Sequence, residues 1–317
     1  YVLYAEIDKF NPFNYELEYE KLSVMDKWVL SKLHSLIKFA DENLENYHIT
    51  EAARAIEDFT DDLSNWYVRR SRERFWQKGM EQDKINAYMT LYSVLNNIAK
   101  ISAPFIPFMT EEIYRNISYG LNASLPLSIH LCDYPEYNEH YIDQELEKNM
   151  EAALRIVVLG RAARNSANIK TRQPLSRMYV KTDFKLPDVL INIIEDELNV
   201  KKIDYIDDTK FFFEYKIKPQ LKVLGPKYGK LMPKINVALN ELDGQKVVES
   251  FNRGESLILE IEGRKIELLE DELLIEKREK EGLIFSEDRG ITVIMDINLT
   301  SELIEEGFVR ELISKIQ

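Results

Sequence analysis

The spacing of apolar residues along this 317-residue chain changes near Pro174, and that change limits the folds open to it. From residue 19 to about residue 119, apolar side chains recur every three or four positions, as they do on amphipathic helices. We expect four helices there, beginning near Asp26, Thr50, Asp83 and Thr110. Short connections between such helices favour an antiparallel bundle, because each helix must bury its apolar side against its neighbours.

A long helix is expected over about 143–167, and after Pro174 the pattern alternates between strand and helix. Strands are expected at 175–180, 200–206, 256–261, 265–269, 283–286 and 291–296. Further helices are expected at 186–198 and from about Ser301 onward. The predicted fold is therefore an α-helical bundle followed by mixed α+β C-terminal domains. The predicted domains are a bundle at 1–138, an α+β junction domain at 139–210, and an α+β C-terminal domain at 211–317 that is truncated at its end.

The composition is that of a globular protein, with 45% hydrophobic and 31% charged residues. No apolar run is long enough to span a membrane and no signal peptide opens the chain, so we expect no membrane partner. The single cysteine, Cys132, excludes an internal disulfide and a cysteine-rich zinc site, and it favours a cytoplasmic location. Because the chain starts without methionine and stops within a helical pattern, we expect a fragment of a larger protein.

The net charge of −13 is unfavourable for a nucleic-acid partner, but the charges are segregated along the chain. Residues 155–185 contain eight basic residues and one acid, and residues 216–234 contain six lysines and no acid. Acidic residues concentrate between 255 and 288. A chain of this kind can hold a phosphate backbone on one surface and keep the rest soluble.

Catalytic chemistry finds little support in the sequence. The four histidines do not pair on one helix face, and no glycine-rich phosphate loop is present. Acid pairs such as Asp61–Asp62 are better explained as helix-surface charges than as an acid–base couple. We therefore predict no catalytic or metal-binding residues and no cofactor for this chain.

Residues 61–76 contain several arginines and large aromatic residues close together. On a helix, Trp66 and Tyr67 fall on the buried side, while Arg69, Arg72 and Trp76 point outward. Outward arginine and tryptophan side chains suit phosphate contact and base stacking. The alternative is a solvated basic face, with Arg70 at the boundary paired to a nearby acid such as Asp62.

Two more basic clusters follow. Arg161, Arg164, Asn165 and Asn168 have the spacing of one polar helix face, which Lys170 and Arg172 extend into a loop. That face fits phosphate and ribose, or arginines that bridge two domains. Between residues 222 and 230, Gly225, Pro226 and Gly229 predict a turn that displays lysines, either for phosphate contact or for solubility. The predicted RNA-binding residues are Trp66, Arg69, Arg70, Arg72, Arg74, Trp76, Arg161, Arg164, Asn168, Lys170, Arg172 and Lys227.

Residues 62–72, Asp-Leu-Ser-Asn-Trp-Tyr-Val-Arg-Arg-Ser-Arg, resemble the hallmark of the anticodon-binding bundle in isoleucyl-tRNA synthetases, which are class I aminoacyl-tRNA synthetases. The related valyl and leucyl enzymes carry looser versions of this stretch. Agreement in order and spacing extends to residues 4–12, 168–175, 197–201, 224–229 and 305–313. The resemblance therefore covers essentially the whole chain.

The resemblance implies that the chain binds the anticodon arm and positions tRNA(Ile) for ATP-dependent aminoacylation by a catalytic domain that the chain lacks. The family's HIGH and KMSKS signatures and its editing domain are absent here, so we expect this fragment to be inactive. The resemblance implies that the parent enzyme uses ATP and Mg. Its partners would be tRNA(Ile) and the catalytic and editing domains of the same polypeptide, in a monomer.

Many bacterial members of the family end in a four-cysteine zinc module. Here only Cys132 is present and the ending differs, so the chain resembles the eukaryotic and archaeal branch, which some bacteria share, and no C-terminal zinc site is expected. Two alternatives stay open. One is the same region of a valyl-type synthetase, and the other is a protein-docking module without an RNA role.

Overall fold

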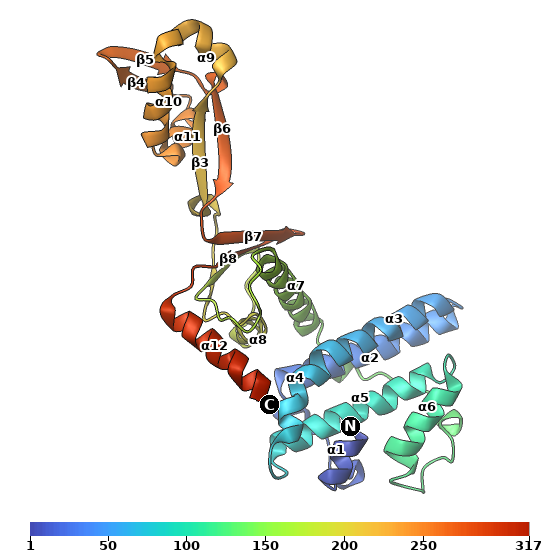
Figure 1. The fold of residues 1–317 in the computed structure, drawn as a ribbon. Coiled ribbons are helices and arrows are strands. Elements are labelled where there is room, and N and C mark those ends of the chain that lie inside the picture. The colour runs from blue at the N-terminus through green and yellow to red at the C-terminus, as the bar shows by residue number, and fades with distance from the viewer. Residues whose placement is uncertain (317) are drawn as a thin grey trace. The chain divides into compact units, whose positions relative to one another are not determined.

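The computed structural model describes residues 1–316, and every side chain in that range except that of Lys277. The chain forms two compact units, Tyr1–Glu151 and the residues from Ala152 onward (Figure 1). The boundary between them falls inside helix α7 (Gln144–Ser166). The division into three domains at 138 and 210 remains a prediction.

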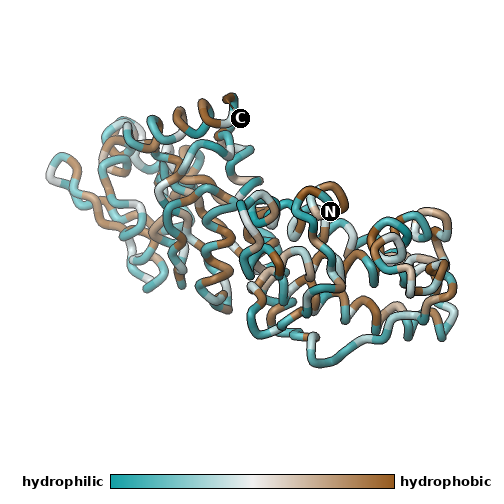
Figure 2. The backbone as a smooth tube through the Cα atoms, turned by 90° about the horizontal axis from the view of Figure 1, so that it is seen from below, coloured by the Kyte–Doolittle hydropathy of each residue, from teal (hydrophilic) through white to brown (hydrophobic). Residues whose placement is uncertain are grey.

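The first unit is a helical bundle, as predicted. Its helices are α1 (Val2–Ile7), α2 (Val24–Glu45), α3 (Ile49–Asp62), α4 (Arg69–Trp76), α5 (Gln82–Ser102) and α6 (Pro107–Tyr114). Figure 2 shows hydrophobic (brown) and hydrophilic (teal) residues interspersed along the coils of the chain. Helix α2 packs against α3 and α5, and the core between them includes Trp28, Leu33, Ile37, Tyr88 and Val94, each at most 1% exposed.

Helix α2 begins earlier than the sequence suggested. Asp26 was predicted to cap it, but the N-cap is Ser23. The Ser23 hydroxyl accepts a hydrogen bond from the Asp26 backbone N–H at 3.2 Å, and the Asp26 carboxylate accepts one from the Ser23 N–H at 3.1 Å. In this capping box each side chain satisfies a backbone donor that the helix leaves unpaired. Asp26 is therefore the third residue of the helix, and it is fully buried.

The second predicted helix is continuous, but its middle part is not α-helical. A π-helical turn, Leu63–Val68, lies between α3 and α4, and a second one, Arg115–Tyr119, follows α6. A π turn has more residues than an α turn, so it rotates the positions of the residues that follow it around the helix axis. Such turns are frequent at functional sites, and this one contains Trp66 at its centre.

Arg74 on α4 joins three helices through hydrogen-bonded ion pairs. Its two Nη atoms donate to the two carboxylate oxygens of Asp26 on α2, each at 2.8 Å, and its Nε donates to Asp83 on α5 at 3.0 Å. The Tyr67 hydroxyl donates to the same Asp26 carboxylate at 2.6 Å. Burial alone would raise the pKa of Asp26, but Arg74, Tyr67 and Ser23 outweigh it and hold that pKa below its ordinary value.

The second unit contains a four-stranded sheet in the order β2-β1-β8-β7. Its strands are β1 (Met178–Lys181), β2 (Ile203–Tyr205), β7 (Leu283–Asp288) and β8 (Ile291–Asp296). Strand β1 pairs with β2 in parallel and with β8 antiparallel, and helix α8 (Asp188–Leu198) makes the crossover from β1 to β2. The final helix is α12 (Ser301–Ile316).

Helix α7 approaches α8 closely because residue 160 is glycine. A Cβ atom at Gly160 would lie 2.3 Å from Cδ1 of Leu198, a side chain that is completely buried. That separation is far shorter than van der Waals contact, so even alanine would force Leu198 or the helix to move.

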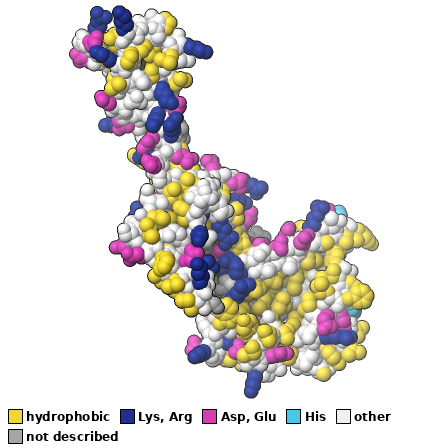
Figure 3. Space-filling model, in the orientation of Figure 1, with side chains coloured by type: hydrophobic (Ala, Val, Ile, Leu, Met, Phe, Trp, Pro, Cys, Tyr) yellow, Lys and Arg dark blue, Asp and Glu magenta, His cyan; other side chains and the backbone are white. Residues whose placement is uncertain are grey.

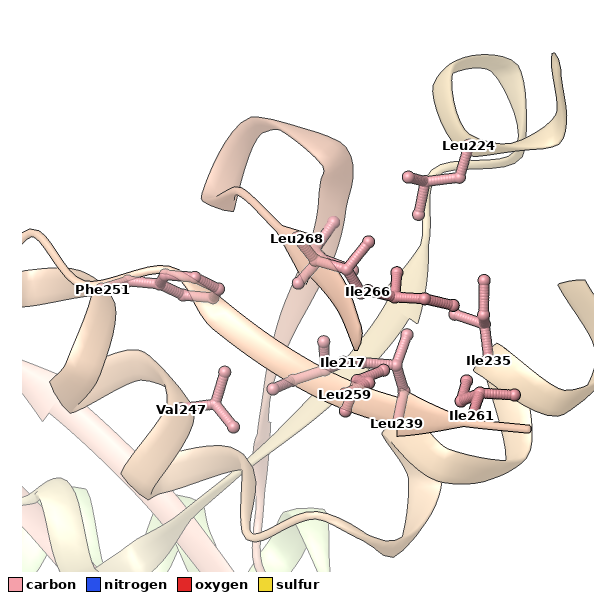
Figure 4. Packing of buried hydrophobic residues seen from close by; sticks show 11 residues of the cluster. Ile217, Leu224, Ile235, Leu239, Val247, Phe251, Leu259, Ile261, Ile266 and Leu268 are labelled. Carbon is pink, nitrogen blue, oxygen red and sulfur yellow. The ribbon is translucent and has the colours of Figure 1, made fainter. Parts of the chain in front are cut away.

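Between β2 and β7 the chain forms an inserted layer with its own core. Strand β3 (Phe213–Pro219) pairs antiparallel with β6 (Leu273–Glu279), and β4 (Leu257–Ile261) pairs antiparallel with β5 (Arg264–Leu268). Three helices lie between β3 and β4, namely α9 (Leu221–Tyr228), α10 (Met232–Glu241) and α11 (Gly244–Asn252). Figure 4 shows its core side chains, among them Ile217, Ile235 and Leu268, pointing toward one another.

The sequence pattern did not predict β3, β6 or these three helices. In particular, the turn predicted around Gly225 and Pro226 is wrong, because both residues lie inside α9. Leu224 is completely buried and anchors this short helix to the core, and Gly229, with φ +31°, ends it. Tertiary burial therefore outweighs the local turn preference of Gly-Pro.

Short 3-10 turns connect several of these elements, at Pro12–Asn14, Tyr19–Lys21, Ile129–Leu131, Glu139–Tyr141, Lys210–Phe212, Gly229–Leu231 and Glu270–Glu272. Among the helices of residues 1–316, none is both long and apolar enough to cross a membrane. The predicted fold class, a helical bundle followed by a mixed α+β part, is confirmed.

Replacing Arg74 with methionine should destabilise the first unit by about 3–5 kcal/mol, because it leaves the buried Asp26 carboxylate without its cation. The ordinary pKa of the Asp26 carboxyl group is 3.8, and the ion pair lowers it. The pair therefore stabilises the fold fully above pH 3.8, and this stabilisation is lost as the pH falls through the lowered pKa of the folded protein. The difference between the wild-type protein and Arg74→Met should therefore be full at pH 7 and shrink below pH 3.8.

Chemical denaturation across pH measures this difference. Arg54→Met is the matched control, because Arg54 is exposed on α3, and it should change stability by less than about 0.5 kcal/mol. Equal stability of Arg74→Met and wild-type protein at neutral pH would rule out a structural role for the pair.

Gly160→Ala should also destabilise the protein. We expect overpacking against Leu198 to cost about 1–3 kcal/mol, which outweighs the gain of about 1 kcal/mol in helix propensity. Denaturant unfolding of this variant can be compared with that of Gly225→Ala in α9, where no atom lies within 4 Å of the added Cβ. A gain in stability from Gly160→Ala would contradict the close α7–α8 contact.

Candidate nucleic-acid interface

The π-helical turn separates the two sides of the Arg/Trp cluster as the sequence predicted. Trp66 is 9% exposed and Tyr67 is completely buried, whereas Arg69 lies at the surface. The Arg69 guanidinium carbon lies 5.6 Å from the Trp66 ring centroid, and its Nε donates to the Asn65 carbonyl at 2.9 Å. These two contacts hold the Arg69 side chain along the helix.

Arg72 and Trp76 follow on the next turn and line a common cavity of ≈ 330 Å³. Arg72 is exposed, Trp76 is 58% exposed, and the Trp76 indole N–H donates to the Tyr4 hydroxyl at 2.9 Å. The rest of the lining comes from Tyr1, Tyr4, Val68, Phe75 and Leu91. A guanidinium beside exposed aromatic rings is an arrangement that can stack on a nucleobase and contact its phosphate.

Arg70 and Arg74 differ from their exposed neighbours. Arg70 is half-buried, and Asp62, its expected partner, binds Lys32 instead. Arg74 has its donors occupied by Asp26 and Asp83. The backbone path explains the difference, because the π turn places Arg74 toward α2 and α5 while Arg72 stays outside.

In the second cluster, the structure does not place the four predicted donors on one solvent face. Arg161 is half-buried and its Nη2 donates to Glu197 at 2.6 Å, whereas Arg164 is only 1% exposed. The chain folds back over Arg164 directly after α7, where the Ile169 N–H donates to the Arg164 carbonyl at 3.0 Å. Asn165 is exposed on the last turn of α7.

Residues 168–173 form the loop that covers Arg164. Asn168 is exposed and takes the left-handed conformation, with φ +54°. Lys170 is exposed and lies 3.1 Å from Glu311 of α12. Arg172 is exposed beside a cavity of ≈ 340 Å³, which is also lined by Thr171, Asp196, Asn199, Arg310, Ile313 and Ser314.

The lysine-rich segment of the inserted layer is partly neutralised. Lys227 donates to Glu272, a side chain that is buried, and this contact lowers the pKa of Glu272. Lys222 and Lys230 remain exposed, and Figure 3 shows Lys and Arg side chains at the α9 end of this layer. These side chains can attract phosphate without any base specificity.

Two residues at this candidate interface were not among the predicted site residues. Glu197 pairs with Arg161, and Asn199 contacts the 168–173 loop through its amide. Both lie in the 197–201 segment, whose agreement with the family was the available signal. In the part of the chain that the structure describes, no group of three or more His, Cys, Asp or Glu side chains is placed to hold a metal ion.

Comparison with known proteins agrees with this arrangement. Residues 26–179 match the family of the anticodon-binding domain of tRNA ligase. Over the whole chain, the sequence is 49% identical to an isoleucine–tRNA ligase of Clostridium novyi and 50% identical to one of Clostridium tetani. It is 38% identical to isoleucine–tRNA ligase 2 of Bacillus cereus. The chain spans 30% of the length of each of these relatives.

These relatives correct one prediction. The lack of a cysteine module suggested the eukaryotic and archaeal branch, but the relatives come from Clostridium and Bacillus, which are bacteria. The absence of four cysteines reports only that these residues build no such metal site, and it does not identify a lineage. The matches show that residues 26–179 are similar to an anticodon-binding domain of tRNA ligase, and that the whole chain is similar to part of bacterial isoleucine–tRNA ligases.

Proposed function

We propose that this chain binds the anticodon arm of tRNA(Ile) through the outward face of the π-helical turn and α4. The observation that carries the proposal is the pair Arg72 and Trp76, which are exposed on one open cavity inside the segment that matches the anticodon-binding family. Arginine supplies charge for phosphate, and the indole ring supplies a stacking surface.

The predicted RNA-binding residues take two kinds of role in this proposal. Residues with exposed side chains contact RNA, and these are Arg69, Arg72, Trp76, Asn168 and Arg172. Residues that are buried or paired with other side chains support them, and these are Trp66, Arg70, Arg74, Arg161, Arg164, Lys170 and Lys227. A guanidinium whose donors are already hydrogen-bonded would have to break those bonds before it could hold a phosphate.

Within the parent protein, we propose that the bound tRNA is positioned for ATP- and Mg-dependent attachment of isoleucine by a catalytic domain outside this chain. The chain itself would be inactive in that reaction. Its other partners would be the catalytic and editing domains of the same polypeptide, with the protein acting as a monomer in the cytoplasm. The names of the relatives favour isoleucine over the valyl-type alternative.

A protein-docking role is the second candidate, because the first unit exposes large apolar side chains. Phe108 and Met109 on α6 are 91% and 63% exposed, and Figure 3 shows a broad area of apolar side chains over this unit. Docking through such a surface would resist salt, whereas phosphate contact is weakened by it.

Arg72→Gln should weaken binding to a tRNA(Ile) transcript and reduce its salt dependence. Each phosphate contact that is lost lowers the slope of log affinity against log salt by about 0.7–0.9. The measurement is a binding titration at several salt concentrations, with Arg54→Gln as the matched control because Arg54 is exposed on α3, away from the cavity.

An unrelated tRNA tests whether the chain itself reads the anticodon arm. Preference for tRNA(Ile) would support the proposal in full, and equal binding would restrict it to a phosphate grip. Salt-independent binding, or no binding at low salt, would favour the docking role instead.

A further inference from the structure

Four consecutive backbone carbonyls, those of residues 170–173, accept hydrogen bonds from the side chains of only two residues. Nη1 of Arg164 donates to the first and the last of these carbonyls, at 3.0 and 2.9 Å. Nδ2 of Asn199 donates to the two between them, at 3.1 and 2.9 Å. The two side chains thus hold the whole loop from its inner side, and we call them the carbonyl clamp.

The clamp is anchored from both directions. Arg164 also donates through Nη2 to the Asn199 backbone carbonyl at 3.0 Å, so its two residues are bonded to each other. Asn199 ends α8 in the left-handed conformation, with φ +49°, which asparagine tolerates better than most residues. Gln173, the last loop residue, donates to the Leu303 carbonyl of α12 at 2.7 Å.

Stability alone is a weak reason for this use of Arg164. The side chain is 1% exposed and its Nε has no hydrogen-bond partner, and in residues 1–316 no carboxylate pairs with it. Burial lowers the pKa of Arg164 to about 10, so the guanidinium still carries its charge at neutral pH. A buried charge satisfied only by carbonyls is costly, and a well-packed apolar residue would often stabilise the fold more.

The clamp has a clear consequence for the outer side of the loop. Because the carbonyls point inward, Lys170, Thr171 and Arg172 carry their side chains outward, and all three are exposed. Arg172 lines a cavity with Asp196 and Arg310, of which Arg310 already donates to Glu306, and Lys170 is paired with Glu311. An arginine on a mobile loop would lose conformational entropy on binding an anion, whereas a fixed loop has lost it already.

We infer that Arg164 and Asn199 are positioning residues that hold the 168–173 loop as a preformed phosphate-binding element, which presents Arg172 to the RNA backbone. The inference rests on the proposed function, since the phosphate is that of the bound tRNA. It assigns the buried arginine and the exposed arginine of one segment to different tasks, although both look alike in the sequence.

The test compares three variants of the 317-residue chain by titration with a tRNA(Ile) transcript across salt. Arg172→Gln removes a phosphate contact and should lower the salt slope by about 0.7–0.9. Arg164→Lys keeps the charge but loses the forked geometry, and Asn199→Gly keeps the left-handed backbone but loses the amide. Both should weaken binding by about tenfold, the effect of losing one or two preordered side chains, while the slope stays unchanged.

Amide hydrogen exchange of the free protein gives a readout that does not depend on RNA. Exchange in residues 168–173 should become faster in Arg164→Lys and Asn199→Gly but not in Arg172→Gln. Two controls match these changes, because Arg289→Lys alters an exposed arginine in the same way and Glu262→Gly replaces another left-handed residue, with φ +54°. Asn199→Gly keeps the test decisive if Arg164→Lys fails to fold.

The outcomes separate this inference from the proposed function. If the unsubstituted chain does not bind the transcript at low salt, the proposed function fails and the phosphate role of the loop fails with it. If the unsubstituted chain binds but Asn199→Gly binds equally well, the clamp inference alone is overturned. Unchanged amide exchange in residues 168–173 of both Arg164→Lys and Asn199→Gly would also overturn it, since these side chains would then not be what holds the loop.

Discussion

The ion pair between Arg74 and Asp26 is the interaction on which the first unit depends most. Asp26 is completely buried, and a buried carboxylate is tolerated only when a cation and hydrogen-bond donors surround it. Arg74 supplies both through a two-pronged contact, and its third contact reaches Asp83. The pair therefore fixes α4 against α2 and α5, and the orientation of every outward side chain on α4 follows from it.

The second unit also buries a charged side chain, the guanidinium of Arg164, and there backbone carbonyls accept its hydrogen bonds in place of a carboxylate. Arg164 is as deeply buried as Asp26, and it holds a loop where Arg74 holds a helix. In both units an interior arginine fixes the backbone that carries exposed cations, Arg72 in one and Arg172 in the other. The number of arginines in the sequence is therefore larger than the number whose side chains could contact RNA. The exposed arginines are held in place by the buried ones.

The helical period predicted the bundle and correctly placed Trp66 and Tyr67 inside and Arg72 outside, because burial on a helix is a local property of spacing. It could not distinguish Arg72 from Arg74 by task, because the partner of Arg74 lies 48 residues away on another helix. Strand β3 was missed for a related reason. Its pairing with β6 joins residues such as Ile217 and Ile275, and its exposed lysines resemble those of a loop.

Local pairing also explains how an acidic chain can offer a surface to RNA. Several cations of the basic segments already have carboxylate partners, as in Lys227 with Glu272 and Lys218 with Glu276, so they contribute little field beyond a Debye length of about 10 Å. A net charge of −13 gives no long-range attraction to RNA, so under the proposed function affinity would come from cations in direct contact with phosphate. The positions of these cations then matter more than their number. This gives a physical reason why two buried arginines, Arg74 and Arg164, hold the backbone that carries the exposed Arg72 and Arg172.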